Sequence, residues 1–203
     1  MRGSSINIQL ASRYSDFMMP LEGIRVLDLS RILAGPHAAQ SLSDLGADVI
    51  KVEAPWGDDS RTWGPPFQKG FDGAEVASYF LSCNRGKKIV FANLKNERER
   101  VRSLMDTVDV VIENFKPGAF DRLLGPVNAD LIVCSISGYG QEGPRRDESA
   151  FDLTMQARSG IMSVTGEEGG PPAKVGVAWI DVMTGMNAVS SILACLLRRD
   201  RGG

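Results

Sequence analysis

Short apolar runs alternate with stretches of helical character along most of this chain, and this alternation restricts the fold more than any other feature. The predicted strands lie at residues 24–29, 47–52, 89–94, 110–112 and 131–134. Between them, residues 37–45 and 101–108 have helical character. Strands that are apolar throughout are typical of a sheet covered on both faces. We therefore predict an α/β fold with right-handed βαβ crossovers and a doubly wound, mostly parallel sheet.

Two segments depart from this alternation. Residues 55–73 are rich in glycine and proline, so we expect a long surface loop without regular elements there. The last third predicts a helix at about residues 151–161, a loop over residues 166–172 and a helix at about residues 182–199. The apolar part of that last helix, residues 183–197, is shorter than the roughly 20 residues of a membrane span. It predicts a buried helix and no membrane partner.

The composition excludes several classes of protein. The 203 residues are 43% hydrophobic and 24% charged, which is typical of a chain with one substantial core. A net charge of -2 removes the electrostatic basis for a nucleic-acid partner. The cysteines Cys83, Cys134 and Cys195 are odd in number and widely spaced, and His37 is the only histidine. We therefore expect a reducing compartment, with no disulfide framework and no metal site.

The amino-terminal residues 1–19 differ in composition from the rest of the chain. They contain two arginines, several serines and a single acid, Asp16. This composition is that of a flexible extension or a weak transit peptide, and it leaves the mitochondrial matrix and the cytoplasm both open. The remaining residues, 20–203, predict one domain.

A glycine motif at residues 138–143 matches the dinucleotide-binding pattern G-x-G-x-x-G. That pattern requires the glycines to open a helix, and a further strand to end in an acid about 20 residues later. Here Pro144 follows the glycines, and the chain near Gly160 has helical character. We therefore expect no nicotinamide or flavin cofactor. The glycines favour the close approach of a ligand or of another chain segment.

Catalytic chemistry in this chain must come mainly from carboxylates. His37 follows Gly35-Pro36 at a predicted helix start, and no G-x-S-x-G nucleophile elbow accompanies it, which favours a packing role. Asp181 ends the apolar run of residues 175–180 and directly precedes the last predicted helix. A carboxylate there is either a helix cap or a catalytic group, and its position leaves both open.

Basic side chains follow two junctions of the predicted sheet. Arg85, Lys87 and Lys88 come after Asn84, and Arg122 follows the segment of residues 114–118. Loops beyond the carboxyl ends of parallel strands converge at a ligand crevice. These groups predict a site for a phosphorylated, adenine-bearing ligand, held by charge and stacking, with solvated surface side chains as the alternative.

Five sequence blocks, in order along the chain, together resemble the class III (CaiB/BaiF) CoA-transferases. The blocks are PLEGIRVLDLS (20–30), LAGP (33–36), LGADVIKVE (45–53), VIENFKPG (111–118) and SISGYG (135–140). The resemblance covers residues 20–199, and the loop at residues 57–66 is most similar to members that use succinyl-CoA and glutarate. It implies a Rossmann-like fold and, for chains of full length, a homodimer.

The resemblance also implies a nucleophile, because the family's catalytic aspartate lies in a D-x-x-T-G segment that here is residues 181–185. Asp181 would attack an acyl-CoA to give a mixed anhydride and then an aspartyl-CoA thioester, which a carboxylic acid resolves. The CoA thioester is a substrate, and no metal or tightly bound cofactor is implied. The implied CoA contacts are Ile32, Ala34, Asn84, Arg85, Asn114, Phe115 and Arg122. The implied lining of the active site is Leu33, Tyr139 and Gly140.

The chain departs from the family pattern at several positions. Phe151 replaces the histidine that α-methylacyl-CoA racemases use, so racemase activity is less expected. Leu33 replaces the glutamine of formyl-CoA transferases, which disfavours formate or oxalate as substrates. Ala54 stands where many members carry an arginine that meets the adenine, and the segment of residues 122–130 is shorter than in relatives. Both differences concern the implied CoA site.

The largest departure is length, because family members are considerably longer. The sequence resembles the amino-terminal half of such an enzyme, comprising the first part of its CoA-binding large domain. The alternative to a transferase is therefore a catalytically silent CoA-binding or assembly fragment that needs a partner chain.

Overall fold

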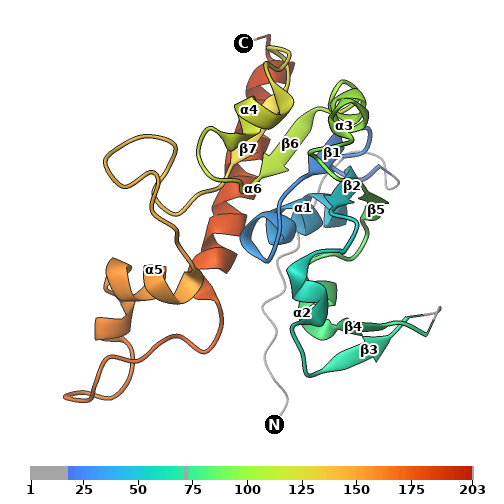
Figure 1. Cartoon of the computed structure of the whole chain (residues 1–203). Helices are drawn as coiled ribbons and strands as arrows, with labels where there is room; N and C mark the ends of the chain where they lie inside the picture. The colour runs from blue at the N-terminus through green and yellow to red at the C-terminus, as the bar shows by residue number, and fades with distance from the viewer. Residues whose placement is uncertain (1–17, 71–72, 203) are drawn as a thin grey trace.

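A computed structural model describes residues 18–70 and 73–202, and most of the expected amino-terminal extension lies outside these residues. A five-stranded parallel sheet forms the centre of the domain (Figure 1). Its strands are β1 (Arg25–Asp28), β2 (Asp48–Glu53), β5 (Lys88–Phe91), β6 (Val110–Glu113) and β7 (Ile132–Ser135). The predicted α/β class with a mostly parallel sheet is confirmed.

The strand order, β5-β2-β1-β6-β7, places the first strand in the middle of the sheet. Val26 of β1 pairs with Val49 of β2 on one side and with Val110 of β6 on the other. The chain therefore winds outward in one direction to β5 and then reverses to β6 and β7. The loops after β1 and β6 leave the sheet in opposite directions at this reversal, which is where open α/β sheets bind ligands.

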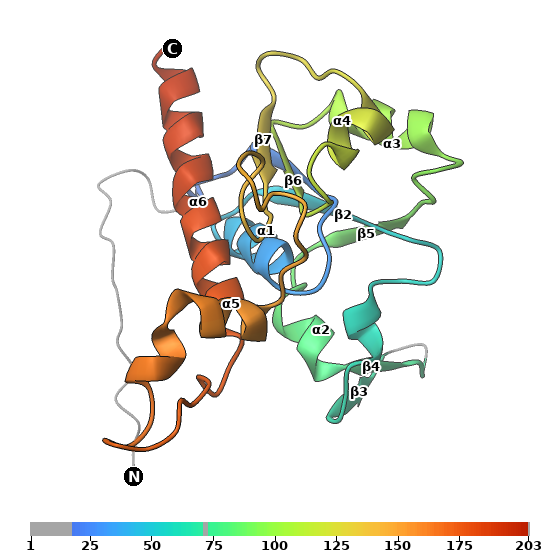
Figure 2. The ribbon, with the colours of Figure 1, turned by 60° about the vertical axis from the view of Figure 1, so that its left-hand side comes forward.

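Helices cover both faces of the sheet (Figure 2). On one face α1 (Ala34–Asp44) and α6 (Trp179–Asp200) pack around Val26 and Ile112. On the other, α3 (Arg98–Met105) and α4 (Ala119–Leu124) pack around Leu27. Because neighbouring residues of a strand point to opposite faces, Val26 and Leu27 belong to different core clusters. This explains why the strands are apolar throughout.

The last helix, α6, is longer than predicted and is not a buried helix. It begins at Trp179, three residues before the expected start, and only 22% of its most apolar 18-residue window is buried. By length and composition alone it could cross a membrane. One stripe of the helix, which includes Gly185 and Ile192, packs into the core, whereas Met186 and Leu197 are exposed. The prediction of a buried helix is therefore wrong, because only a narrow stripe of α6 contacts the core and its other apolar side chains are left exposed.

The prediction that residues 55–73 lack regular elements is also wrong. They contain the short helix η1 (Asp59–Thr62) and strand β3 (Phe67–Lys69), which pairs with β4 (Glu75–Ala77) in an antiparallel hairpin. Helix α2 (Ser78–Ser82) follows directly. The three residues of β3 are all exposed, so no alternation of apolar and polar residues marks them.

The segment between β7 and α6 contains α5 (Asp152–Ser159), which ends at Gly160, and the short helix η2 (Ile161–Val164). Gly160 has a φ of 82°, the left-handed conformation that ends many helices, and it divides the single helix expected there. The glycine motif at residues 138–143 lies in an irregular loop that no helix follows directly. The prediction that these glycines do not open a helix is confirmed.

Close packing of α6 on α1 leads to a first prediction. A Cβ atom on Gly185 would lie 2.8 Å from the Ala34 carbonyl oxygen, so Gly185→Val forces the helices apart. We expect a loss of about 2–3 kcal/mol in the free energy of unfolding, measured by urea denaturation. Ser190→Val, at an exposed position of the same helix, is the matched control and should change it by less than about 0.5 kcal/mol. Equal stability of the two variants would contradict the close contact.

Candidate active site

Two loops meet at the reversal point between β1 and β6. The backbone amide of Arg31 donates to Asn114 Oδ1 at 3.0 Å, and Asn114 Nδ2 donates to the Arg31 carbonyl at 2.8 Å. This reciprocal pair joins the loop of residues 29–33 to the loop after β6. Asn114, an expected CoA contact, therefore also positions Ile32 and Leu33.

A buried ionic cluster, comprising Asp28, Lys51, Asp58 and Lys87, lies beneath this loop. Lys51 Nζ is 3.1 Å from Asp58 Oδ2 and 3.8 Å from Asp28 Oδ2, and all three side chains are fully buried. Lys51 Nζ also donates to the Ser30 carbonyl at 2.8 Å. Lys87 Nζ lies 2.8 Å from Asp28 Oδ2. The cluster therefore connects the carboxyl ends of β1 and β2.

Opposite charges decide the ionisation of this buried ionic cluster. Burial by itself would raise the pKa of Asp28, but the positive charges of Lys51 and Lys87 outweigh it and the pKa is lowered. Burial would lower the pKa of Lys51, but Asp28 and Asp58 outweigh it and the pKa is raised. For Lys87 burial prevails over Asp28, and the pKa is lowered. The cluster is thus stabilised by its own pairs rather than poised for catalysis.

The loop after β2 is anchored to the same cluster. Asp58 accepts hydrogen bonds from the amide and hydroxyl of Ser60, at 3.0 and 2.7 Å, and from the amide of Ile32 at 3.3 Å. Ile32 has a φ of 74°, a left-handed conformation that is strained for a β-branched residue. Glu53 pairs with Arg61 through bonds of 2.6 and 2.8 Å. The contacts of Asp58 hold the backbone of Ile32 just beyond the carboxyl end of β1.

The sequence patterns considered above do not predict this buried ionic cluster. Its signal was available, because Lys51 interrupts the apolar run Val49-Ile50 and Val52 of a predicted strand. A lysine inside a strand that is apolar on both sides requires a buried anionic partner.

The expected convergence of Arg85, Lys87 and Lys88 with Arg122 beyond the carboxyl ends of the strands is wrong. Residues 84–87 precede β5 and Lys88 is its first residue, so all of them lie at its amino end. There Arg85 pairs with Asp44, and Lys88 Nζ is 2.6 Å from Asp48. Lys87 is the exception, because its side chain reaches into the buried ionic cluster.

The remaining expected CoA contacts are divided between buried and exposed positions. Asn84 is 6% exposed, with its Nδ2 donating to the Phe80 carbonyl and its Oδ1 accepting from Lys87, so its polar atoms are occupied. Ala34 is buried at the start of α1, and Phe115 is half-buried after β6. Arg122 is exposed on α4.

Asp181 lies in the first turn of α6, inside the helix rather than before it. It is not the cap, because the carboxylate that accepts from the first amides of α6 is Asp152, at 2.8 Å from Ile180 N. Burial, with the negative charge of Asp152, raises the pKa of Asp181 to about 6. Burial, with the charge of Asp181, likewise raises the pKa of Tyr79 on α2 to about 12. Asp181 is therefore a half-buried, partly desolvated carboxylate that interacts electrostatically with Asp152 and Tyr79.

The other expected lining residues differ in their burial. Leu33 is buried, and the Tyr139 hydroxyl is buried without a hydrogen-bond partner among the described residues. His37 Nδ1 is buried and equally unpartnered, close to Gly185 of α6, and burial lowers the pKa of this histidine. This environment fits the packing role expected for His37.

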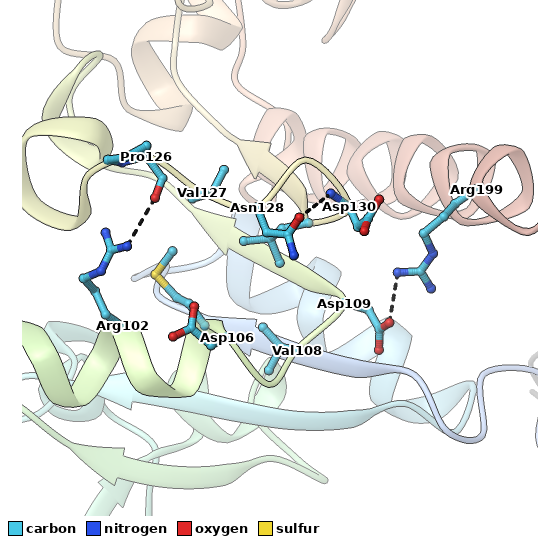
Figure 3. A pocket seen from close by; sticks show the side chains of 11 residues that line it. Arg102, Asp106, Val108, Asp109, Pro126, Val127, Asn128, Asp130 and Arg199 are labelled. Atoms are coloured by element: carbon cyan, nitrogen blue, oxygen red, sulfur yellow. Dashed lines mark hydrogen bonds and ion pairs between the residues drawn. The ribbon is translucent and has the colours of Figure 1, made fainter. Parts of the chain in front are cut away.

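Two cavities open on the described part of the chain. One of about 430 Å³ opens at the amino ends of β6 and β7, where Arg102 bonds the Pro126 carbonyl and Arg199 pairs with Asp109 (Figure 3). None of the expected site residues lines it. A second, of about 370 Å³, lies between β7 and α6 and includes Gly140. Within residues 18–70 and 73–202 no group of three acidic, cysteine or histidine side chains could hold a metal ion.

The chain is similar to known CoA-transferases along nearly its whole length. The family model described as CoA-transferase family III matches residues 21–203. A succinate–glutarate CoA-transferase of Agrobacterium fabrum is 49% identical over 194 residues, which are 91% of this chain and 48% of the relative. The human succinyl-CoA:glutarate CoA-transferase is 45% identical over 193 residues, 91% of this chain and 43% of the relative.

A solved structure shows the same fold. The crystal structure of a CaiB/BaiF family protein from Brucella suis superposes with a TM-score of 0.87 at 48% identity. The match covers 91% of this chain and 51% of that protein. The chain thus spans about half the length of the relatives it matches.

The buried ionic cluster leads to a second prediction. Lys51→Met leaves Asp28 and Asp58 buried without their shared cation, and we expect it to lower the free energy of unfolding by about 3–5 kcal/mol or to prevent folding. Lys88→Met removes an exposed ion pair and should cost less than about 1 kcal/mol in the same urea titration. A Lys51 variant as stable as the Lys88 variant would show that the cluster is not required.

The raised pKa of Asp181 gives a third prediction, on stability. The folded state holds this proton more tightly than the unfolded state, so the carboxylate lowers the free energy of unfolding as pH rises from about 4 through about 6. Asp181→Asn should therefore be more stable than the wild type at pH 7.5, by about 1–2 kcal/mol, and no more stable at pH 4. A variant that is less stable at pH 7.5 would contradict the desolvation of Asp181.

Proposed function

The chain belongs to CoA-transferase family III, and from this premise we propose that it transfers CoA from succinyl-CoA to a dicarboxylate such as glutarate. The observation that carries the proposal is the desolvated Asp181 carboxylate at the start of α6, within the D-x-x-T-G segment. Support for these substrates comes from the succinate–glutarate CoA-transferase that is 49% identical over 194 residues.

We propose the following sequence of steps. An oxygen of Asp181 attacks the thioester carbonyl of succinyl-CoA, the carbon–sulfur bond breaks, and CoA thiolate leaves behind a mixed anhydride. The thiolate attacks the Asp181 carbonyl carbon and releases succinate, which yields an aspartyl-CoA thioester. Glutarate attacks this thioester to give a second anhydride and thiolate, which recombine as glutaryl-CoA and restore the Asp181 carboxylate. Atoms and charge balance without a metal or a redox cofactor.

The environment of Asp181 suits this role. A carboxylate with a raised pKa is more basic, and hence more nucleophilic toward a carbonyl, than one in water. With a pKa of about 6 it is still mostly ionised above neutral pH. The half-buried position also reduces the access of water, which would hydrolyse the anhydride intermediates.

We propose that CoA lies along the loops at the reversal point of the sheet. Backbone groups near Ile32 and Ala34, the ring of Phe115, and the charge of Arg122 would contact it, with Asn114 fixing the first loop. Leu33, Tyr139 and Gly140 would line the active site. For Asn84 and Arg85, whose side chains are engaged by Lys87 and Asp44, we propose a structural role in place of direct contact.

The second candidate function is a silent CoA-binding or assembly module that acts with another chain. The exposed apolar face of α6, with Met183, Met186 and Leu197, favours it. So does the open edge of β7 beside the cavity that α6 lines. We also propose homodimerisation and a location in the mitochondrial matrix or the cytoplasm. Racemase activity is the least favoured, since Phe151 cannot exchange a proton.

A fourth prediction tests the transferase directly. The purified chain, incubated with succinyl-CoA and glutarate, should form glutaryl-CoA detectable by mass spectrometry, and Asp181→Asn should reduce the rate at least about 1000-fold. Asp147→Asn, at an exposed position, is the matched control and should retain the wild-type rate. The rate should also fall as pH decreases through about 6, because protonation removes the nucleophile.

The two candidates differ in the outcome of this assay. Turnover that survives in Asp181→Asn would exclude Asp181 as nucleophile. Absence of turnover in the folded wild-type chain, together with CoA binding by calorimetry, would favour the binding or assembly module. Absence of both would contradict each function for the isolated chain.

A further inference from the structure

We infer that Asp152 is a positioning residue for the reaction, which together with Gln156 holds the segment of residues 175–181 and so places the Asp181 carboxylate. This inference rests on the proposed function, because it assigns a role relative to Asp181. It concerns two side chains on α5, a helix that lies across the amino end of α6 (Figure 1, Figure 2).

Asp152 fixes the first turn of α6. Its Oδ1 accepts hydrogen bonds from the amides of Ile180 at 2.8 Å and of Asp181 itself at 3.2 Å. The residue at the normal capping position, Ala178, offers no side-chain acceptor. The carboxylate that caps the amino end of α6 therefore comes from another element, α5. The hydrogen bonding of the first turn of α6 thus depends on α5.

Gln156 fixes the segment that leads into α6. It is 1% exposed, its Oε1 accepts from the Val175 amide at 2.8 Å, and its Nε2 donates to the Val177 carbonyl at 3.1 Å. Its Nε2 also donates to Asp152 Oδ2 at 2.6 Å. The glutamine thus links Val175 and Val177, in a segment without helix or strand, to the same carboxylate.

This bonding pattern requires a carboxylate at position 152. The Gln156 amide cannot be flipped, because its oxygen serves Val175 and its nitrogen serves Val177. Both oxygens of Asp152 must then accept, one from the α6 amides and one from Gln156 Nε2. An asparagine would place its own NH2 group against one of these donors, so Asn cannot reproduce the arrangement.

The carboxylate also has an electrostatic effect on Asp181. Two titratable groups face Asp181 from neighbouring elements, Asp152 on α5 and Tyr79 on α2. Burial is the larger cause of the raised pKa of Asp181, and the charge of Asp152 adds to it. Asp152 therefore both positions Asp181 and raises its pKa. A neutral residue that capped α6 would do only the first.

The test follows Asp181 by NMR rather than by turnover alone. The carboxyl carbon of Asp181, identified by its absence in Asp181→Asn, is titrated in the wild type, in Asp152→Asn and in the exposed control Asp147→Asn. We expect a midpoint near pH 6 in the wild type and the control. In Asp152→Asn the midpoint should fall below that of the wild type but stay above the ordinary aspartate value of about 4, because burial is the larger cause of the shift. The Ile180 amide should exchange at least about 10-fold faster.

An unchanged Asp181 midpoint in folded Asp152→Asn would overturn the inference, since a merely structural substitution leaves that titration where it was. Should Asp152→Asn fail to fold, Gln156→Ala retains the carboxylate and removes the link to Val175 and Val177. Unchanged amide exchange at Val175 and Asp181 in that variant would equally overturn it. Neither result depends on turnover, whereas CoA transfer that persists in Asp181→Asn would refute the proposed function and leave the titration result intact.

Discussion

The burial of Lys51 between Asp28 and Asp58 is the interaction on which the rest of this domain depends. Its ammonium group lies at the carboxyl ends of two adjacent central strands, where it also donates to the Ser30 carbonyl. Removing such a cation leaves two desolvated carboxylates, which is far more costly than the loss of a surface pair. The loops after β1 and β2 therefore have one conformation in which all three charges are satisfied. The strained backbone of Ile32 is held by that same arrangement.

The proposed nucleophile is positioned by a different set of contacts. Gly185 allows α6 to approach the Ala34 carbonyl closely, and Asp152 with Gln156 determines where the helix begins. Gly185, on the same helix as Asp181, is thereby brought against Ala34, the first residue of α1. Ala34 directly follows the loop that the buried ionic cluster supports, so the two sets of contacts adjoin at this residue.

Much of the fold could be predicted from periodicity. The five strands of the sheet and the helices α1, α3 and α6 were recognisable because each carries an apolar stripe or run. The hairpin of β3 and β4 was not, since β3 is exposed and only three residues long. Arg85 and Lys88 were assigned to the wrong edge of the sheet, because chain order places them next to a strand but does not say at which end their side chains lie.

The sequence by itself determined the parallel α/β class, the family and the identity of the candidate nucleophile, because periodicity and motif order are local properties of the chain. Only the tertiary structure decided that Asp181 is desolvated and beside Asp152, that Lys51 lies between two buried acids, and that Asn84 and Lys87 turn inward. Burial and charge pairing arise between residues far apart in sequence. They depend on the register of packed elements, and no local pattern encodes that register.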